Sequence, residues 1–230
     1  MAWAERAGQL GTDVLVCPEL ATTGYVWRDR AALLPHAEPA EGPTFAALAE
    51  VARAHGMWIV CGYPERAGDL LYNAALVISH TGTLVDSYRK VLLFREDLHW
   101  SEPGDHRLLC TTPFGTLATG ICMDLNDPGF TRFLARRQPD VVAFCTNWVD
   151  QGERVEWYWR ERLAGVRGLF VAADSWGDDE GIRFYGRSGV LRGGRTLLQL
   201  GPNGDGLIYG SEGNFTSTAT SSSSDTSGAR

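Results

Sequence analysis

The chain has 230 residues, of which 44% are hydrophobic, and carries a formal net charge of −7 at pH 7. A chain of this length can bury a substantial core as one domain, and an acidic charge without a basic cluster argues against nucleic acid or an anionic membrane as a partner. No apolar run approaches the ~20 residues needed to span a bilayer, and the first residues lack the apolar core of a secretory signal, so we expect a cytoplasmic protein.

Strand and helix patterns alternate along the chain. Residues 2–10 are typical of the end of a helix and 13–18 of a buried strand, and residues 43–55 form an amphipathic helix with Pro43 near its start. We expect further helices near 129–137 and 153–167, and further strands at 57–63, 72–79, 84–91, 107–111, 116–121, 140–145, 169–174 and 187–192. This mixture of parallel crossovers and hairpins fits an α/β fold with a mixed sheet covered by helices.

The composition changes near the C-terminal end. From about residue 201 the chain is rich in Gly, Ser and Thr, a composition that cannot bury a core. We therefore expect one domain over residues 1–200 and a low-complexity, disordered tail over 201–230.

The five cysteines show no paired spacing; they are Cys17, Cys61, Cys110, Cys122 and Cys145. Such usage is typical of reduced thiols in the cytosol rather than of a disulfide framework. The sequence has no CxxC or HxxxH pattern and no Gly-rich phosphate loop after a strand, and Gly193-Gly194 is typical of a hairpin turn. We expect neither a metal nor a cofactor.

Three predicted strands end at residues with reactive side chains. Glu19 follows the strand at 13–18, Lys90 lies at the end of the strand at 84–91, and Cys122 follows the strand at 116–121. Reactive groups collect where the strands of an α/β sheet end. A carboxylate that accepts the thiol proton, a nearby ammonium and free backbone N–H groups are what a nucleophilic cysteine needs.

These residues lie in an ordered set of motifs that resembles the nitrilase (carbon–nitrogen hydrolase) superfamily. The motifs run from about residue 10 to about residue 192 and are Pro18-Glu-Leu20, Thr23-Gly-Tyr25, Tyr88-Arg-Lys90, Pro103-Gly-Asp105, Gly120-Ile-Cys-Met-Asp124, Thr146-Asn-Trp148 and Phe184-Tyr-Gly-Arg-Ser188. The resemblance implies a four-layer α-β-β-α sandwich that associates through its outer helices, hence a homodimer. Members of this family open with a core strand that we do not find here, so we expect the first strand to be missing and one sheet edge to be unpaired.

The resemblance also implies roles for individual residues. Glu19 would be the general base, Cys122 the nucleophile and Lys90 an electrophilic helper that faces the oxyanion together with the backbone N–H of Met123. The implied activity is hydrolysis of a non-peptide C–N bond in an amide, with release of ammonia or an amine through a Cys thioester. Two further residues could line the pocket, Asn147 and Trp148.

A fourth acidic residue of the site is left open among Glu96, Asp97 and Glu102, with a preference for Glu96. The stretch Cys122-Met-Asp-Leu-Asn126 is similar to the branch that contains protein N-terminal asparagine amidases. Two alternatives to the hydrolase stay open: a catalytically silent binding protein that keeps the fold, and an acyltransferase that passes the acyl group to an amine.

Overall fold

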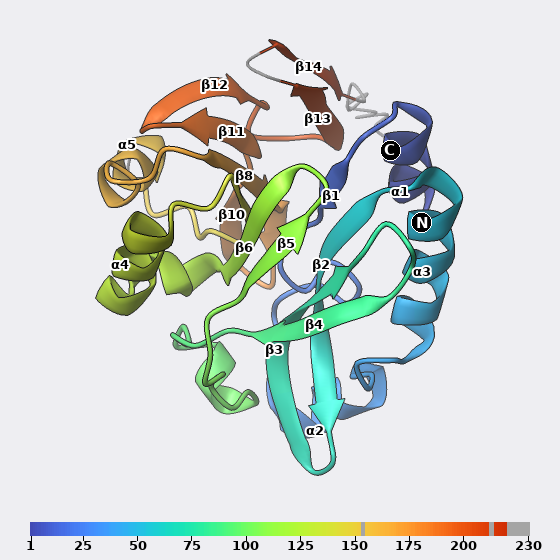
Figure 1. Ribbon diagram of the computed structural model, residues 1–230. Helices are drawn as coiled ribbons and strands as arrows, with labels where there is room; N and C mark the ends of the chain where they lie inside the picture. Colours follow the sequence, from blue (N-terminus) through green and yellow to red (C-terminus); the bar gives the residue numbers. More distant parts are fainter. Residues whose placement is uncertain (153–154, 212–213, 220–230) are drawn as a thin grey trace, which may run out of the picture.

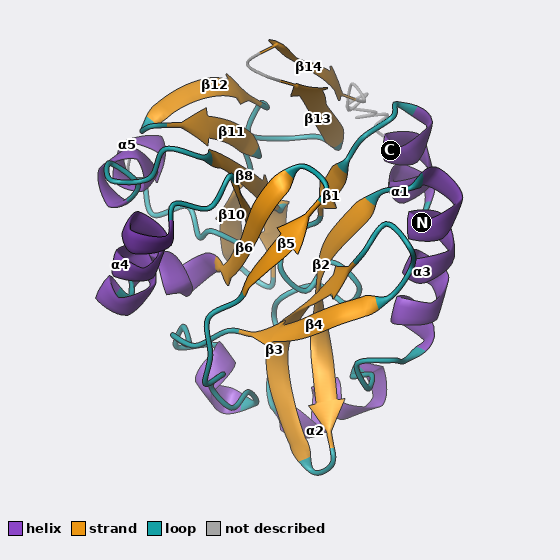
Figure 2. Ribbon diagram, in the orientation of Figure 1, coloured by secondary structure: helices purple, strands orange, loops and turns teal. Residues whose placement is uncertain are grey.

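The computed structural model describes residues 1–152, 155–211 and 214–219. Two β-sheets lie face to face, and helices cover the outer face of each sheet (Figures 1 and 2). Three apolar clusters fill the spaces between the layers, one in the middle and one under each helical layer. The expected α-β-β-α sandwich is confirmed.

The first sheet has the strand order β1-β2-β3-β4, with β1 parallel to β2 and the other pairs antiparallel. Its strands are β1 (Val14–Val16), β2 (Trp58–Ala67), β3 (Leu70–Ile78) and β4 (Leu84–Arg89). The first eight residues of β2 and the last eight of β3 are buried, as expected for strands with apolar layers on both faces. The strand β1 lies at the edge of this sheet.

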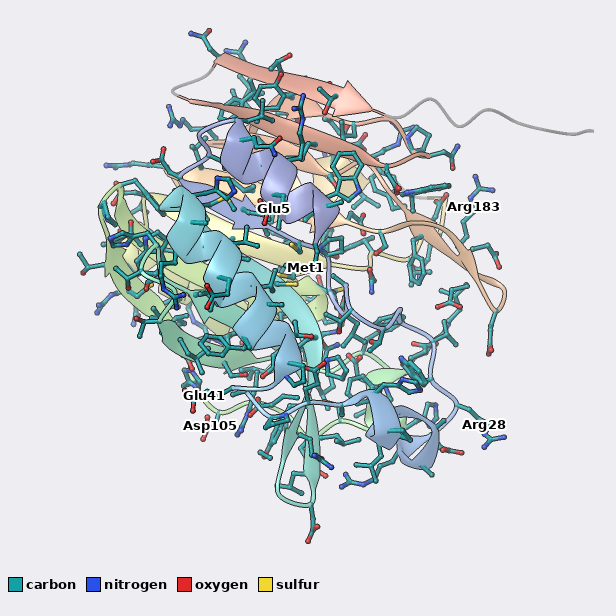
Figure 3. The ribbon with its side chains drawn as sticks, turned by 90° about the vertical axis from the view of Figure 1, so that its right-hand side faces the viewer. Met1, Glu5, Arg28, Glu41, Asp105 and Arg183 are labelled. Atoms are coloured by element: carbon teal, nitrogen blue, oxygen red, sulfur yellow. The ribbon has the colours of Figure 1, made fainter. Side chains whose placement is uncertain are left out.

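Helices α1 (Ala2–Gln9) and α3 (Pro43–His55) cover the outer face of the first sheet. In Figure 3 the labels Met1 and Glu5 locate α1, which lies beside α3. The bounds of α3 match the prediction, because Pro43 occupies its first turn and Gly56 ends it with φ of 64° in the left-handed region.

The second sheet has the order β12-β11-β8-β7-β6-β5. Its strands are β5 (Leu109–Thr112), β6 (Gly115–Ile121), β7 (Val141–Thr146), β8 (Leu169–Asp174), β11 (Gly189–Arg192) and β12 (Arg195–Gln199). The three central strands β6, β7 and β8 are parallel, so their carboxyl ends share one edge of the sheet. Helices α4 (Pro128–Arg137) and α5 (Val155–Arg162) pack on the outer face.

Short elements complete the described part of the chain. They are α2 (Arg30–Leu33), the 3₁₀ helices η1 (Leu34–His36), η2 (Asp97–His99) and η3 (Cys122–Asn126), and two antiparallel pairs, β9 (Trp176–Asp179) with β10 (Ile182–Tyr185) and β13 (Gly206–Ser211) with β14 (Asn214–Ala219). No helix in the described ranges is both long enough and apolar enough to cross a membrane.

The structure contains the strands β9, β10 and β12, which were not expected, and it differs from two of the expected segments. The predicted helix over 153–167 is shorter, because α5 ends at Arg162 and residues 153–154 lie outside the described residues. The expected disordered tail is wrong for the residues of β13 and β14, which pair as a hairpin, and Leu207 of β13 is buried in the cluster under α1 and α3. Residues 220–230 of that expected tail lie outside the described residues. The hairpin expected at Gly193-Gly194 is present and joins β11 to β12.

Candidate active site

The side chain of Lys90 lies at the centre of a buried cluster of polar groups. Its Nζ atom donates to Glu19 Oε1 at 2.7 Å and to Asp97 Oδ2 at 2.6 Å, and all three side chains are fully buried. Lys90 directly follows β4, which ends at Arg89. The backbone N–H of Lys90 donates to Asn73 O, in the neighbouring strand β3, at 2.8 Å. An ammonium has three donors, so two carboxylates leave one N–H of Lys90 available.

The carboxylate of Glu19 is held from several sides. Oε1 accepts from Asn73 Nδ2 at 2.7 Å as well as from Lys90, and Oε2 accepts from the backbone N–H of Asn147 at 2.9 Å. The Asn147 side chain also donates to Glu19 O at 2.8 Å. Because Glu19 follows β1 and Asn147 follows β7, these bonds join the ends of strands from both sheets.

A glycine in β2 makes room for the segment that carries Glu19. A Cβ atom at Gly62 would lie 2.4 Å from Pro18 O and 2.6 Å from the Cα of Glu19. The close approach of the two backbones therefore requires glycine at this position.

Cys122 begins η3, directly after β6, with φ of 40°. Positive φ is uncommon for a residue other than glycine and costs free energy, so the fold holds this thiol in a strained turn. Cys122 is 6% exposed. Burial, then the charge of Glu19, raises the pKa of the Cys122 thiol well above its ordinary value, although the Lys90 ammonium acts in the opposite direction. Burial therefore favours the neutral thiol over the thiolate.

Asp124 connects the turn at Cys122 to the segment after Lys90. Its Oδ2 atom accepts from the Ile121 backbone N–H at 3.0 Å and from the Tyr88 hydroxyl at 2.8 Å. Its Oδ1 atom accepts from the N–H groups of Val91 and Leu92 at 2.9 and 3.0 Å. The buried carboxylate thus fixes the positions of both segments at once.

Burial and the charge of the partner act in opposite directions on the pKa values of Glu19 and Lys90. Burial raises the pKa of Glu19 above its usual value, and the Lys90 ammonium only partly offsets this rise. For Lys90, burial alone would lower the pKa, but the carboxylates of Asp97 and Glu19 outweigh it and hold that pKa well above the ordinary value. A carboxylate with a raised pKa beside a neutral thiol is a suitable acceptor for the thiol proton.

The three residues predicted to act together, Glu19, Lys90 and Cys122, are brought together by the structure. Asn147 also lies in the cluster, and Met123 is the second residue of η3, where the first N–H groups have no partner within the helix. The Trp148 ring packs against Tyr158 and Trp159, with both ring centroids 5.7 Å away.

The preferred fourth acidic residue is not the one that reaches Lys90. The Glu96 carboxylate pairs with Arg95 at 2.7 Å, and Glu102 is exposed, whereas Asp97 bonds directly to Lys90. Asp97 is the first residue of η2, and its Oδ2 atom also accepts from the Phe94 backbone N–H at 2.8 Å. This turn directs the Asp97 side chain inward, which residue spacing alone did not reveal.

Sequence reasoning missed Asn73 altogether. Its Nδ2 atom donates to both Glu19 and Asp97, at 2.7 and 3.0 Å. It lies in β3, whose neighbouring residues are apolar, and a lone asparagine inside such a run was the only signal available. A buried asparagine in an apolar strand needs hydrogen-bond partners, which would have pointed to a polar site.

Comparison with known proteins gives consistent matches. Residues 1–211 match the family model described as carbon–nitrogen hydrolase. The chain is similar to a nitrilase from Pyrococcus abyssi, with 34% identity over 191 residues that cover 80% of this chain and 70% of the relative. It is also similar to a protein N-terminal amidase from Schizosaccharomyces pombe, with 23% identity over 86% of each chain.

Among solved structures, the chain resembles the NitN amidase from Nesterenkonia sp. AN1. The TM-score is 0.75 at 25% identity, covering 86% of this chain and 79% of that one. A mutant of the same amidase carries acrylamide added at its active site cysteine.

Proposed function

Because this chain belongs to the carbon–nitrogen hydrolase family, we propose that it is an amidase that uses Cys122 as nucleophile, Glu19 as general base and Lys90 as electrostatic helper. The observation that carries the proposal is the buried Lys90 ammonium held between Glu19 and Asp97 beside the Cys122 turn. Ionisable groups are rarely buried without a functional or structural reason.

In the proposed reaction the Cys122 thiol transfers its proton to the Glu19 carboxylate as sulfur attacks the amide carbon. The C–S bond forms while the carbonyl π electrons move to oxygen. Glu19 then returns the proton to the leaving nitrogen as the C–N bond breaks, which releases ammonia or an amine and leaves a thioester. Glu19 then takes a proton from water as the water oxygen attacks the thioester carbon. When this intermediate collapses, the C–S bond breaks, Glu19 returns the proton to sulfur, and the carboxylic acid product leaves.

Two groups are suited to face the oxyanion of both tetrahedral intermediates. One is the third N–H of Lys90, which neither carboxylate uses, and the other is the backbone N–H of Met123 at the start of η3. Removing one such donor typically costs on the order of a hundred- to a thousand-fold in rate.

In this proposal Asp97 replaces Glu96 as the fourth site residue. Asp97 accepts a second hydrogen bond from the Lys90 ammonium, and Asn73 donates to both the Glu19 and the Asp97 carboxylates. The proposed role of Asp97 is to position the Lys90 side chain and to keep its ammonium group charged.

The substrate class within the amides is a finer part of the proposal. We propose a substrate with a terminal carboxamide, and the similarity to a protein N-terminal amidase together with the Cys122–Asn126 stretch supports N-terminal asparagine as one candidate. The test is ammonia release from small amides, ureido acids and peptides with N-terminal asparagine or glutamine.

The same assay is run on Cys122→Ala and on Cys110→Ser as a matched control, because Cys110 lies in β5 outside the cluster. We expect Cys122→Ala to abolish release and Cys110→Ser to retain it. Release that persists in Cys122→Ala would refute the nucleophile assignment. Folded protein that releases nothing from the whole panel would favour the catalytically silent binding protein. Adding hydroxylamine and measuring hydroxamate tests for the thioester, and the yield of free carboxylic acid against N-acyl product in the presence of a primary amine distinguishes hydrolysis from acyl transfer.

Two properties of the protein's setting belong to the proposal as well. All five cysteines are free, which supports a reducing, cytoplasmic environment. The proposal also includes a homodimer formed through the outer helices, and Trp157 on one of them, α5, is 58% exposed. Light scattering coupled to size-exclusion chromatography measures the oligomeric state directly.

A further inference from the structure

Thr146 is the last residue of β7 and lies next to the turn that carries Cys122. The strands β6 and β7 are parallel, and their last register pair is Ile121 with Cys145. The next residues along the two chains are Cys122 and Thr146, and β7 contacts η3 directly. Because neighbouring strands of a sheet lie about 4.8 Å apart, this register places the two side chains within reach of each other.

The hydroxyl group of Thr146 is buried without a use in the fold. The residue is 0% exposed, and its Oγ1 atom has no hydrogen-bond partner in the part of the chain that the structure describes. A hydroxyl carries one proton that it can donate. Because a buried polar group without a partner costs free energy, an acceptor that appears beside Thr146 during the reaction would be stabilised by this proton.

The sulfur of Cys122 is the acceptor that this hydroxyl faces. Burial and the charge of Glu19 raise the pKa of the Cys122 thiol, whereas the Lys90 ammonium and the Thr146 hydroxyl act in the opposite direction. The sulfur of a neutral thiol is a weak acceptor, which agrees with the lack of a well-aligned bond to Oγ1. A thiolate is a much stronger acceptor, since a hydrogen bond to the charged form favours that form.

Asp174 is a second group beside Thr146, because the two residues are register partners in β8 and β7. Its Oδ1 atom accepts from the Trp148 backbone N–H at 2.9 Å, whereas Oδ2 has no partner among the described residues. Burial raises the pKa of Asp174 well above its ordinary value and so favours the neutral carboxyl group, which has a proton to donate. A bond from Asp174 to Thr146 Oγ1 leaves the Thr146 proton free for Cys122.

We propose that Thr146 donates a hydrogen bond to Cys122 Sγ as the thiol proton passes to Glu19, and so stabilises the thiolate that attacks the substrate. The S–H bond breaks, its proton moves to the Glu19 carboxylate, and the electron pair left on sulfur forms the C–S bond. The Thr146 proton stays on its own oxygen throughout. The end of β7 then serves both partners of the proton transfer, because the next residue, Asn147, donates its N–H to Glu19 Oε2 at 2.9 Å.

This role rests on the proposed function, because it needs Cys122 as the nucleophile, and variants that keep or remove the hydroxyl test it. Thr146→Val keeps the shape of the side chain and removes the hydroxyl, whereas Thr146→Ser keeps the hydroxyl. Thr146→Ala removes the hydroxyl in a smaller side chain and serves as a second variant if Thr146→Val does not fold. Thr119→Val is the matched control, because Thr119 of β6 is also 0% exposed and its Oγ1 atom also lacks a partner among the described residues.

The first measurement is the rate at which iodoacetamide alkylates Cys122 at different pH values, followed by mass spectrometry of the peptide that contains it. No variant changes the titratable groups that act on the Cys122 thiol, which are Glu19, Lys90, Asp97 and Tyr25. Because the thiolate is the reactive form, we expect Thr146→Val and Thr146→Ala to react at least about tenfold more slowly near neutral pH and to recover at higher pH. Thr146→Ser and Thr119→Val should stay within about twofold of the unsubstituted protein.

The second measurement is the rate of ammonia release by the same variants, each first shown to be folded by a thermal melt. The hydrogen bond from Thr146 strengthens only as charge develops on sulfur. We therefore expect kcat and kcat/KM to fall together, at least about tenfold in Thr146→Val, with KM little changed. Thr146→Ser should restore most of the rate, which a role in packing alone would not explain.

Alkylation separates this role of Thr146 from the proposed function. If the unsubstituted protein releases no ammonia, the proposed function fails, and the alkylation rates still decide whether Thr146 stabilises the thiolate. Equal alkylation rates in folded Thr146→Val and in the unsubstituted protein would overturn the role of Thr146. A Thr146→Ser or Thr119→Val variant as slow as Thr146→Val would also overturn it. A folded, unsubstituted protein in which iodoacetamide does not modify Cys122 at any pH would overturn both proposals.

Discussion

Substituting Asp97 by asparagine tests the buried cluster without changing the size of the side chain. The carboxylate accepts hydrogen bonds from three donors, which are Lys90 Nζ, the Phe94 N–H and Asn73 Nδ2, at 2.6, 2.8 and 3.0 Å. An asparagine amide has one oxygen and one NH₂ group, so its NH₂ must face at least one of these donors. At least one hydrogen bond is lost, and Lys90 also loses one of its two buried counter-charges.

The magnitude follows from these losses. An unsatisfied buried donor costs about 1–3 kcal/mol, and breaking a buried ion pair costs about 3–5 kcal/mol. Because Glu19 still pairs with Lys90 at 2.7 Å, we expect Asp97→Asn to lower the free energy of unfolding by about 2–4 kcal/mol.

Urea denaturation followed by circular dichroism measures this change, and Glu96→Gln is the matched control. Glu96 is adjacent in sequence but pairs with Arg95, whose side chain is 73% exposed, so that loss should stay below about 1 kcal/mol. The reasoning would be refuted if Asp97→Asn lowered the free energy of unfolding by less than about 0.5 kcal/mol, which is on the order of experimental error. It would also be refuted if Glu96→Gln lowered the free energy of unfolding by more than Asp97→Asn does.

Three other predictions concern the same site. Gly62→Ala should destabilise the fold by about 1–3 kcal/mol and reduce ammonia release, whereas Gly165→Ala, whose new Cβ would meet its nearest atom at 3.5 Å, should do neither; thermal melts and the ammonia assay compare them. Asp124→Asn should lower the free energy of unfolding, measured by urea denaturation, by about 2–4 kcal/mol, because the new NH₂ group must face at least one of the groups that donate to the carboxylate. A change near zero would contradict this role of Asp124. Burial raises the pKa of Glu19, and a general base must be deprotonated, so kcat/KM should begin to fall with decreasing pH at a higher pH than for an exposed glutamate. Asp97→Asn removes a negative charge that raises the pKa of Glu19, so the acid limb of the kcat/KM profile should move to lower pH in this variant. An acid limb that does not move would argue against Glu19 as the base.

Some features follow from local sequence alone. The helix α3 was predicted with its correct bounds, because Pro43 and Gly56 act on the backbone of their own residues. The strand ends that carry Glu19, Lys90 and Cys122 were also predictable. An apolar run that stops at a polar residue indicates the end of a strand, whatever the order of the strands in the sheet.

Other features depend on residues that are distant in sequence. Sequence spacing did not distinguish Asp97 from Glu96, because that choice depends on how η2 turns toward Lys90 and on Asn73 from a different strand. The raised pKa of the Cys122 thiol follows chiefly from its burial between two sheets, which no local motif specifies.

The chain by itself therefore determined which reactive groups stand at strand ends and which fold carries them. The tertiary structure decided which carboxylate holds Lys90 and in which direction the pKa values shift. The physical reason is that backbone preferences and apolar periodicity act over a few residues, whereas burial, charge pairing and strand neighbours are set by the packing of the whole molecule.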